Sequence, residues 1–177
     1  MLSTAVNFTH ETVVEPFDIV EGISISPGEY DHEEFTIYAS TDKSAPIDFG
    51  LQFVAGGFFG GDRVTLAPSV GYRIGDQFKV DFSVNHNNVK VPGGAFEFSL
   101  SQLKVSYAFT PKISLQAFVQ HNERDDVFAT NLRFSWLRSA NSGLFVVYNE
   151  TDDDVLHPGR PRKEIILKYS HIFELLQ

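Results

Sequence analysis

The residues best suited to acid–base chemistry lie in short segments that combine His with Asp or Glu. In one segment His121 is followed by Asp125 and Asp126. A carboxylate beside an imidazole can activate water as a general base, which is the chemistry of a protease or a lipase. These three are therefore the candidate catalytic residues. On the same expected outer rim lie His86, Asn87, Asn122, Glu123, Asp152, Asp153, Asp154 and His157.

Two other interpretations of these segments stay open. Acidic loop tips are usually solvated, and they can also bridge lipopolysaccharide through divalent cations. The run at 152–154 lacks the ligand spacing of a calcium loop, and the absence of Cys removes thiolate ligands. The sequence also lacks the motifs of phosphate-binding loops, zinc proteases and serine hydrolases. We therefore predict no metal site and no cofactor.

The elements that must position these side chains are β-strands. From about Phe35 to Phe173, segments of about ten residues alternate apolar with polar or small residues, as between Phe128 and Trp136. A period of two places alternate side chains on opposite faces of a strand. We predict an all-β fold with strands at 4–10, 33–40, 47–56, 63–73, 77–87, 95–109, 112–122, 127–137, 144–150 and 164–173.

Strands of this length, joined by alternating short and long turns, are typical of an antiparallel up-and-down transmembrane barrel. We predict a single domain at 1–177, with an N-terminal strand and loop at 1–29 and a meander of strands at 30–174. Tight turns are expected at 74–76, 110–111 and 139–142, and longer polar loops at 88–94, 123–126 and 151–162. The strands form either a whole barrel of about ten strands or the C-terminal part of a larger one.

The two faces of such a barrel have different roles. Polar strand residues are expected to face a water-filled lumen, where Arg133 pairs with Asp81 or Glu97, and apolar residues are expected to face lipid. The lumen set is Lys79, Asp81, Asn85, Gln116, Gln120, Asn131, Arg133 and Lys168. Aromatic residues near the strand ends are expected to form girdles at the two membrane interfaces. They are Tyr72, Tyr107, Phe109, Trp136, Tyr148, Tyr169 and Phe173.

Three places are expected to be irregular. In the strand at 95–109 the apolar residues change from even to odd positions, which predicts a β-bulge near Ser101 and Gln102. Pro68 removes a ladder hydrogen bond, so its strand needs a bulge there or lies at a sheet edge. Phe58 and Phe59 are bracketed by glycines and are expected at a rim, with their rings in the membrane interface.

The composition excludes one class of partner and one class of membrane segment. Lys and Arg number 14 against 23 Asp and Glu, a net charge of −9, which argues against nucleic acid. No apolar run approaches the roughly 18 residues of a membrane-spanning helix. Residues 1–7 lack the basic and apolar segments of a signal peptide. Because a barrel must be exported, we expect a mature form or the C-terminal part of a longer polypeptide.

Several motifs occur in a familiar order. They are Pro27–Tyr30, Gly57–Gly61, Asn87–Phe96, Tyr107–Pro111, Gln120–Asn122, Asn131–Trp136, Leu144–Glu150 and Leu167–Tyr169. Together they resemble the C-terminal β-barrel region of large bacterial outer-membrane proteins whose N-terminal part is similar to a family-nine carbohydrate-binding domain. The resemblance covers about Pro27 to Phe173 and implies the outer membrane of a Gram-negative bacterium. It implies no particular activity, and it carries over no glycan role.

Three functions remain open from the sequence. The leading hypothesis is an outer-membrane barrel that anchors a larger surface protein or passes small solutes. Its expected partners are outer-membrane lipids and lipopolysaccharide, the barrel-assembly machinery, and an N-terminal domain or partner subunit. The second hypothesis is an outer-membrane hydrolase that uses His121, Asp125 and Asp126. The third is a soluble β-barrel that binds a lipid or a sugar.

Overall fold

The structure, a computed structural model, describes residues 1–139, 142–153 and 160–172. Within these ranges every regular element is a β-strand, which confirms the predicted all-β class. The strands are β1 (Leu2–Val13), β2 (Phe17–Val20), β3 (Ile23–Ile25), β4 (Gly28–Ser40), β5 (Ile47–Phe58), β6 (Gly61–Ile74), β7 (Phe78–Val91), β8 (Gly94–Thr110), β9 (Ile113–Asn122), β10 (Val127–Ser139), β11 (Ser142–Asp153) and β12 (Arg162–His171).

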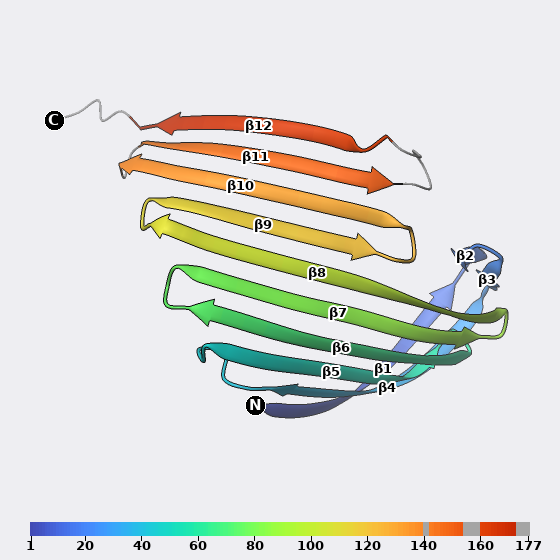
Figure 1. Cartoon of the computed structure of the whole chain (residues 1–177). Coiled ribbons are helices and arrows are strands. Elements are labelled where there is room, and N and C mark those ends of the chain that lie inside the picture. Colours follow the sequence, from blue (N-terminus) through green and yellow to red (C-terminus); the bar gives the residue numbers. More distant parts are fainter. Residues whose placement is uncertain (140–141, 154–159, 173–177) are drawn as a thin grey trace. The chain divides into compact units, whose positions relative to one another are not determined.

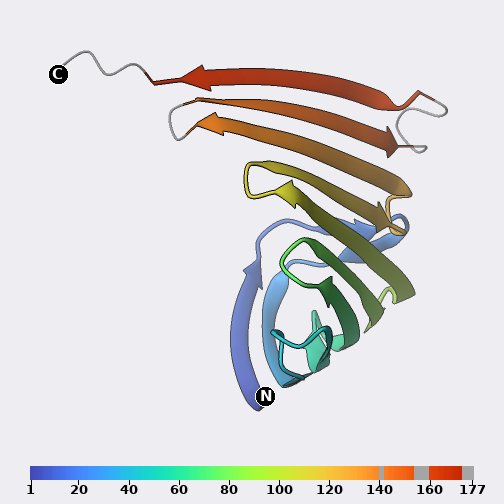
Figure 2. The same cartoon turned by 60° about the vertical axis from the view of Figure 1, so that its left-hand side comes forward.

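Ten of the strands form one antiparallel meander. Their order in the sheet is β1-β4-β5-β6-β7-β8-β9-β10-β11-β12, so nearly every strand pairs with its neighbour in the sequence (Figure 1). Figure 2, which turns the molecule by 60°, shows β9, β10, β11 and β12 side by side in the same order. The order has two ends, β1 and β12, so the strands described do not form a closed ring of pairs. The strands β2 and β3 form a separate hairpin.

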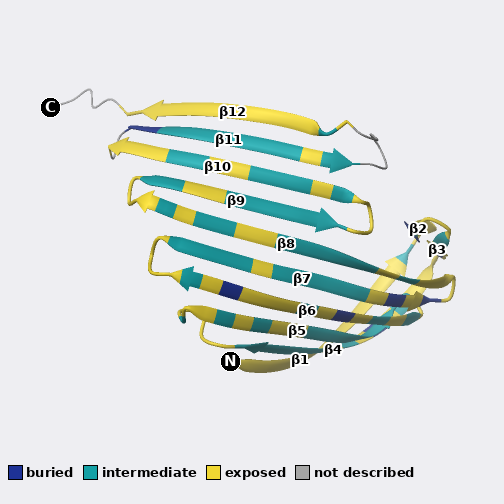
Figure 3. Ribbon diagram, viewed as in Figure 1, coloured by how far each residue is buried: buried dark blue, intermediate teal, exposed yellow. Residues whose placement is uncertain are grey.

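The chain divides into two compact units. Unit 1 contains residues 1–43, 49–69 and 84–99, and unit 2 contains 44–48, 70–83 and 100–177. In unit 1, Ile19, Ile25, Val89 and Val91 form a small buried cluster. The described part of unit 2 contains no buried hydrophobic residue. Figure 3 shows most strands as half-buried or exposed, with buried positions confined to short stretches.

Two segments that the sequence predicts as loops are strands instead. The β2–β3 hairpin lies within the loop predicted after His10, and β7 continues to Val91 through much of the loop predicted at 88–94. Packing between these two segments accounts for both changes. Ile25 of the hairpin and Val89 of β7 belong to the same buried cluster, and each is 2% exposed. The rim expected to carry long loops therefore has a two-residue turn between β7 and β8.

The predicted bulge near Ser101 and Gln102 is wrong for the pairing of β8 with β9. Register is unbroken from Leu100 to Ala108, and it shifts only between Ala108 and Thr110. Apolar residues change face in β8 because the even-numbered Phe96 and Phe98 pack on the buried cluster of unit 1. The β2–β3 hairpin covers the side of β8 on which Phe96 and Phe98 lie, so the change of apolar face along β8 does not require a bulge. Pro68 also does not mark an edge, since β6 lies between β5 and β7.

Candidate functional site

Backbone pairing shows which side chains share a face in unit 2. Leu132 of β10 lies opposite Ala117 of β9 and Tyr148 of β11, and Tyr148 lies opposite Ile165 of β12. Residues at two-residue steps from these form one continuous apolar surface, which we call the apolar face of unit 2. It also carries Leu103, Val105, Leu115, Val119, Phe128, Phe134, Leu144, Val146 and Leu167.

This apolar face is exposed. Ile165 is 73% exposed and Leu167 is 70% exposed, and even Leu132 in the middle of the sheet is 38% exposed. At a rise of about 3.3 Å per residue, the apolar positions from Phe128 to Trp136 extend about 26 Å along β10. That length is comparable to the apolar band of about 25 Å on outer-membrane barrels. Soluble monomers rarely expose an apolar surface of this extent.

The opposite side of unit 2 is polar, and we call it the polar face. Gln116 lies opposite Arg133, Gln120 lies opposite Gln102, and Lys168 lies on the same side of β12. Amides join neighbouring strands across this face: Asn131 Nδ2 donates to Asn149 Oδ1 at 2.5 Å, and Asn149 Nδ2 donates to Glu164 Oε2 at 3.2 Å. Gln116, Gln120, Asn131, Arg133 and Lys168 thus share one face; that this face borders a lumen stays a prediction.

The charged residues expected to pair across the lumen do not pair with one another in the part of the chain that the structure describes. Asp81 forms an ion pair with Lys79, two residues away on β7, with Nζ and Oδ1 2.7 Å apart. In the described ranges Arg133 makes no ion pair, with Asp81 or any other residue. The expected Asp81–Arg133 pair is therefore not formed. Lys79 and Asp81 have the i, i+2 spacing that places both on one side of a strand.

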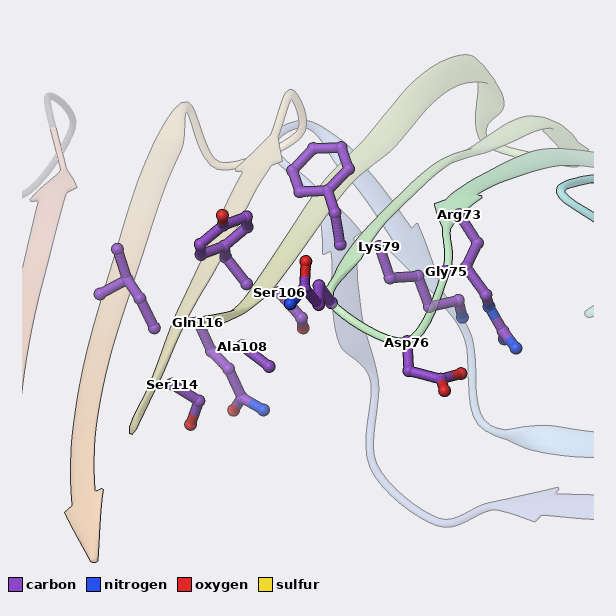
Figure 4. Close-up of a pocket in the computed structure, with 12 residues that line it drawn as sticks. Arg73, Gly75, Asp76, Lys79, Ser106, Ala108, Ser114 and Gln116 are labelled. Atoms are coloured by element: carbon purple, nitrogen blue, oxygen red, sulfur yellow. The ribbon is translucent and has the colours of Figure 1, made fainter. Parts of the chain in front are cut away.

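A hollow of about 260 Å³ lies at the end of unit 2 where β7 begins and β8 ends (Figure 4). Its labelled lining includes Lys79 and Arg73 together with Ser106, Ser114 and Gln116. Ser114 and Ser135 share a hydrogen bond of 2.9 Å at this level of the sheet. The lining offers hydroxyl, amide and cationic groups together with the carboxylate of Asp76 and the rings of Phe78 and Tyr107, which suits water and small polar solutes.

Unit 1 has the same two-sided character. In its register Val6 of β1 lies opposite Phe35 of β4, which lies opposite Ala55 of β5. Phe8 on this side is 73% exposed. We call this side the apolar face of unit 1. It also carries Leu2, Ile37, Leu51 and Phe53 by register, and Val64 and Leu66 by alternation along β6.

The β2–β3 hairpin covers the other face of unit 1. Its Ile25 packs with Val89 and Val91 of β7. These two residues lie at two-residue steps from Asn87 and therefore on the same side of the strand. Asn87 Oδ1 accepts a hydrogen bond of 2.7 Å from the Thr65 hydroxyl, and Asn87 Nδ2 donates to Asn85 Oδ1 at 2.6 Å. The covered face therefore carries the polar residues Asn85, Asn87 and Thr65 beside the apolar Val89 and Val91, while the apolar face is left open. A soluble sheet protein has the opposite arrangement, with its apolar face covered.

A group of charged and aromatic side chains lies on this covered face. His32 is 6% exposed, and its Nε2 is 3.6 Å from Glu11 Oε2. Both ring nitrogens of His32 lack a hydrogen-bond partner. Arg63 forms an ion pair with Glu34, and its guanidinium lies 4.8 Å from the centre of the Phe58 ring. The grouping of His32, Glu11, Arg63 and Glu34 could not be predicted from the sequence, because it depends on pairing between strands.

The Phe58–Phe59 pair lies at a turn, as expected, but the rings have a different role. The Phe59 ring lies edge-on to the rings of Phe17, Tyr30 and Phe58, with centroids 4.8–5.7 Å apart. It also packs edge-on against His32 at 5.3 Å. The rings therefore join the hairpin to the covered face. That they enter a membrane interface stays a prediction.

The candidate catalytic residues lie together but loosely. His121 Nε2 is 3.7 Å from Asp126 Oδ1, and both side chains are substantially exposed. Asp125 instead accepts a hydrogen bond of 2.6 Å from Asn122 Nδ2 and pairs with Arg124 at 3.8 Å. The His121 ring lies against Phe128 at 6.2 Å. This arrangement shows an exposed His–Asp contact, and it adds no base-activated nucleophile to the hydrolase hypothesis.

The aromatic residues divide into two groups. Tyr107, Trp136 and Tyr169 lie on the apolar face of unit 2 near the end where β8, β10 and β12 terminate. Tyr148 instead lies in mid-strand, opposite Leu132, so its expected position at a strand end is wrong. Phe109 packs edge-on to Tyr107 at 4.7 Å, and Tyr72 is 44% exposed on β6. Phe173 lies outside the described residues.

Beyond the apolar positions the strands end in ion pairs. Glu150 accepts hydrogen bonds from the Tyr148 hydroxyl and from Lys163, and these hold the pKa of its carboxyl below the usual value. The same contact with Glu150 raises the pKa of Lys163. In unit 1 the hydrogen bond to Asp31, 2.8 Å long, raises the pKa of His10. Each apolar face is therefore bounded at one end by charged groups.

Comparison with models of protein families, with curated protein sequences and with solved structures finds no significant match. Among the residues described, no helix is long and apolar enough to cross a membrane. The same residues contain no group of three or more His, Cys, Asp or Glu side chains able to hold a metal ion. The two faces of the sheet are therefore the features on which a function can be argued.

Proposed function

We propose that the chain forms part of the wall of a bacterial outer-membrane β-barrel, which anchors a larger surface protein or passes small solutes. One observation carries the proposal: the side of unit 1 that carries Val6, Phe8 and Phe35 is left open, whereas the β2–β3 hairpin covers the side that carries the Val89 cluster together with Thr65, Asn85 and Asn87. Hydrocarbon is the solvent that suits an open apolar face bordered by charged residues. The resemblance to outer-membrane barrel regions points in the same direction.

The energetics of unit 2 give further support. Its described residues bury no hydrophobic side chain, so the hydrophobic effect within the unit contributes little to its stability. Backbone pairing alone leaves a sheet only marginally stable in water. Contact of the apolar face with lipid would supply the missing stabilisation, at roughly 25 cal/mol per Å² of apolar surface removed from water.

We assign the membrane-spanning segments to the apolar positions of each strand. They run from Leu2 to Phe8 in β1, from Phe128 to Trp136 in β10, and from Leu144 to Tyr148 in β11. Expected contacts beyond these positions are lipid headgroups and lipopolysaccharide. An unpaired strand edge is costly in hydrocarbon, so β1 and β12 must be paired in the membrane. The barrel-assembly machinery is the expected catalyst of insertion.

Membrane extraction tests the proposal directly. The chain, expressed with an export signal in a Gram-negative host, is expected in the outer-membrane fraction and is expected to need detergent for release. Salt and alkaline washes remove peripheral proteins and are the control. Release by buffer or salt alone would contradict the proposal and favour a soluble barrel. Conductance of the purified chain in a planar bilayer then separates a solute channel from an anchor.

A further inference from the structure

Each end of the ten-stranded sheet is a strand with one free edge. The strand β1 pairs only with β4, and β12 pairs only with β11. Every residue of β12 is exposed, and so is every residue of β1 except Val13. Unpaired backbone groups along such an edge readily bind a further strand, and in hydrocarbon they are costly. The two free edges are therefore the surfaces of this wall that most need a partner.

The backbone groups that point outward can be assigned on both edges. At the start of β1, Met1 N donates to the Ser40 carbonyl at 2.6 Å, and Ser40 N donates to the Met1 carbonyl at 2.9 Å. Because antiparallel pairs alternate, the even-numbered residues of β1 direct their N–H and C=O groups to the free edge. The hydrogen bond from Leu137 to Lys112, followed through the register of β10, β11 and β12, leaves the odd-numbered residues of β12 facing its free edge.

The residues with outward backbone groups also carry the apolar faces. The even-numbered Val6 and Phe8 lie on the apolar face of unit 1, and the odd-numbered Ile165 and Leu167 lie on the apolar face of unit 2. All four side chains are exposed. An antiparallel pair of β12 with β1 that matches the outward backbone groups therefore also places apolar residues opposite apolar residues.

One register satisfies both strands. When Phe8 lies opposite Ile165, the apolar residues of the two strands align and Glu11 lies opposite Arg162. Glu11 is 47% exposed, although its Oε2 also lies 3.6 Å from His32 Nε2. In the described ranges Arg162 makes no ion pair. Opposite charges directly across a strand pair are stabilising, so the register gains an ion pair beyond its apolar contacts.

Neighbouring registers are less favourable. A shift of two residues in one direction places Glu11 opposite Glu164, which puts like charges together. The same shift in the other direction places Phe8 opposite Lys163. A shift of one residue moves the whole apolar set of one strand to the other face. The sequences of the two edges therefore select a single alignment.

The charges around the two edges are also complementary. The strand β12 contains three basic residues and one acidic residue, which are Arg162, Lys163, Lys168 and Glu164. Residues 1–42, which include β1, contain nine Asp and Glu and no Lys or Arg. Two β1 edges would bring two acidic segments together, whereas β1 beside β12 brings an acidic segment next to a basic strand.

We propose that the free edge of β12 in one copy of the chain pairs with the free edge of β1 in a second copy, with Phe8 opposite Ile165. The inference rests on the proposed outer-membrane wall and names the partner that completes it. Like-with-like contacts need two different interfaces to cover both edges. The head-to-tail contact covers both with one interface, and copies that close into a ring leave no edge unpaired.

A disulfide between copies tests the contact. In the proposed register Asn7 lies opposite Ile166 at a non-hydrogen-bonded position, where Cα atoms are about 4.5 Å apart and a disulfide can form. Since the chain has no Cys, a copy with Asn7→Cys and a copy with Ile166→Cys can be joined only across chains. The two copies carry tags of different length and are co-expressed with an export signal in a Gram-negative host. Mild oxidation is expected to give a cross-linked mixed dimer.

A matched control fixes the register. Thr9→Cys lies on the same side of β1 as Asn7→Cys, but its Cα would be about 7–8 Å from that of Ile166, which is too far for a disulfide. We expect its yield with the Ile166→Cys copy to be at least about five-fold lower. Equal yields from the two combinations would overturn the register. Cross-linking of Ile166→Cys copies to one another would show like-with-like pairing and overturn the proposal.

A charge reversal tests the ion pair. Glu11→Arg, added to the Asn7→Cys copy, puts like charges opposite each other and is expected to lower the yield of mixed dimer at least about two-fold. Arg162→Glu, added to the Ile166→Cys copy, is expected to restore it. Loss of the Glu11 contact with His32 cannot explain such a rescue, because the second change is in the other copy. A yield that stays low would contradict the pairing of Glu11 with Arg162.

The variant Asn7→Cys/Ile166→Cys separates a second copy from the same chain. We expect it to form cross-linked oligomers. A disulfide within a monomer would show that β12 pairs with β1 of its own chain and would overturn the proposal, as would the absence of a disulfide in every combination. Extraction is a separate readout: a chain that still needs detergent leaves the outer-membrane wall intact, whereas release by buffer alone contradicts it.

Discussion

The ring of Phe59 lies edge-on against the ring of His32, with the two centroids 5.3 Å apart. This contact comes from a strained position, since Phe59 has a backbone φ of +43° in the two-residue turn between β5 and β6. Bulky residues are rarely found in that region, where Gly or Asn is preferred. The turn therefore keeps an unfavourable residue whose ring packs with four neighbouring aromatic side chains.

Replacing Phe59 separates the strain from the packing. Phe59→Ala loses the ring contacts but keeps a side chain at positive φ, and we expect it to destabilise the protein by about 3 kcal/mol. Phe59→Gly loses the same contacts and relieves the strain, so it should cost about 1 kcal/mol less than Phe59→Ala. Urea unfolding in detergent micelles measures both values. A Phe59→Gly variant more stable than the unchanged protein would show that the ring contacts do not offset the strain.

Charge placed on the two faces of β10 tests which face meets lipid. Leu132→Arg puts a guanidinium on the apolar face of unit 2 and is expected to cost about 2–4 kcal/mol in a bilayer. Asn131→Arg, one residue away, puts the same group on the polar face and should cost less than about 1 kcal/mol. Folding equilibria in liposomes measure the difference. Equal costs at the two positions would contradict the assignment of the faces.

Two adjacent glycines in β5 differ in how much space they have. A Cβ at Gly56 would lie 2.1 Å from the Glu33 carbonyl oxygen, whereas at Gly57 the nearest atom is 3.6 Å away. We expect Gly56→Ala to destabilise the protein by about 2 kcal/mol, because the backbone of β4 must move. Gly57→Ala is the matched control, with an expected change below about 0.5 kcal/mol. Thermal unfolding in detergent compares them, and equal losses would contradict the close approach of β4 and β5.

The contact between His10 and Asp31 predicts a pH dependence at the edge of unit 1. Because Asp31 raises the pKa of His10 above the model-compound value of 6.5, the contact helps hold β1 on β4 below that pH. The stabilisation is lost as the pH rises through the higher pKa of the folded state. NMR titration should give a His10 pKa above 6.5 in the unchanged protein and a lower one in Asp31→Asn. The same pKa in both proteins would show that the pair does not form.

The alternation of side chains was sufficient to predict the elements that carry the two faces. The pattern from Phe128 to Trp136 predicted a strand at 127–137, and β10 spans Val127–Ser139. The same period placed Gln116, Asn131 and Arg133 on one face, as the register shows. Such predictions succeed because each depends only on neighbours along one strand.

What the sequence did not predict depends on contacts between distant segments. The strands β2 and β3 have four and three residues, too few for alternation to distinguish them from a loop. Without that hairpin, the change of face at Phe98 had no explanation except a bulge. The grouping of His32, Glu11 and Arg63 was hidden for the same reason.

The order of pairing in the meander has a consequence for how such a chain can change over evolutionary time. From β4 onward each strand bonds to its successor, so any two consecutive strands form a self-contained hairpin. Duplicating or deleting one hairpin preserves the direction of every strand that follows it, whereas gaining or losing a single strand reverses them all. Walls of this kind are therefore expected to grow and shrink in steps of two strands, with both chain ends kept on the same side.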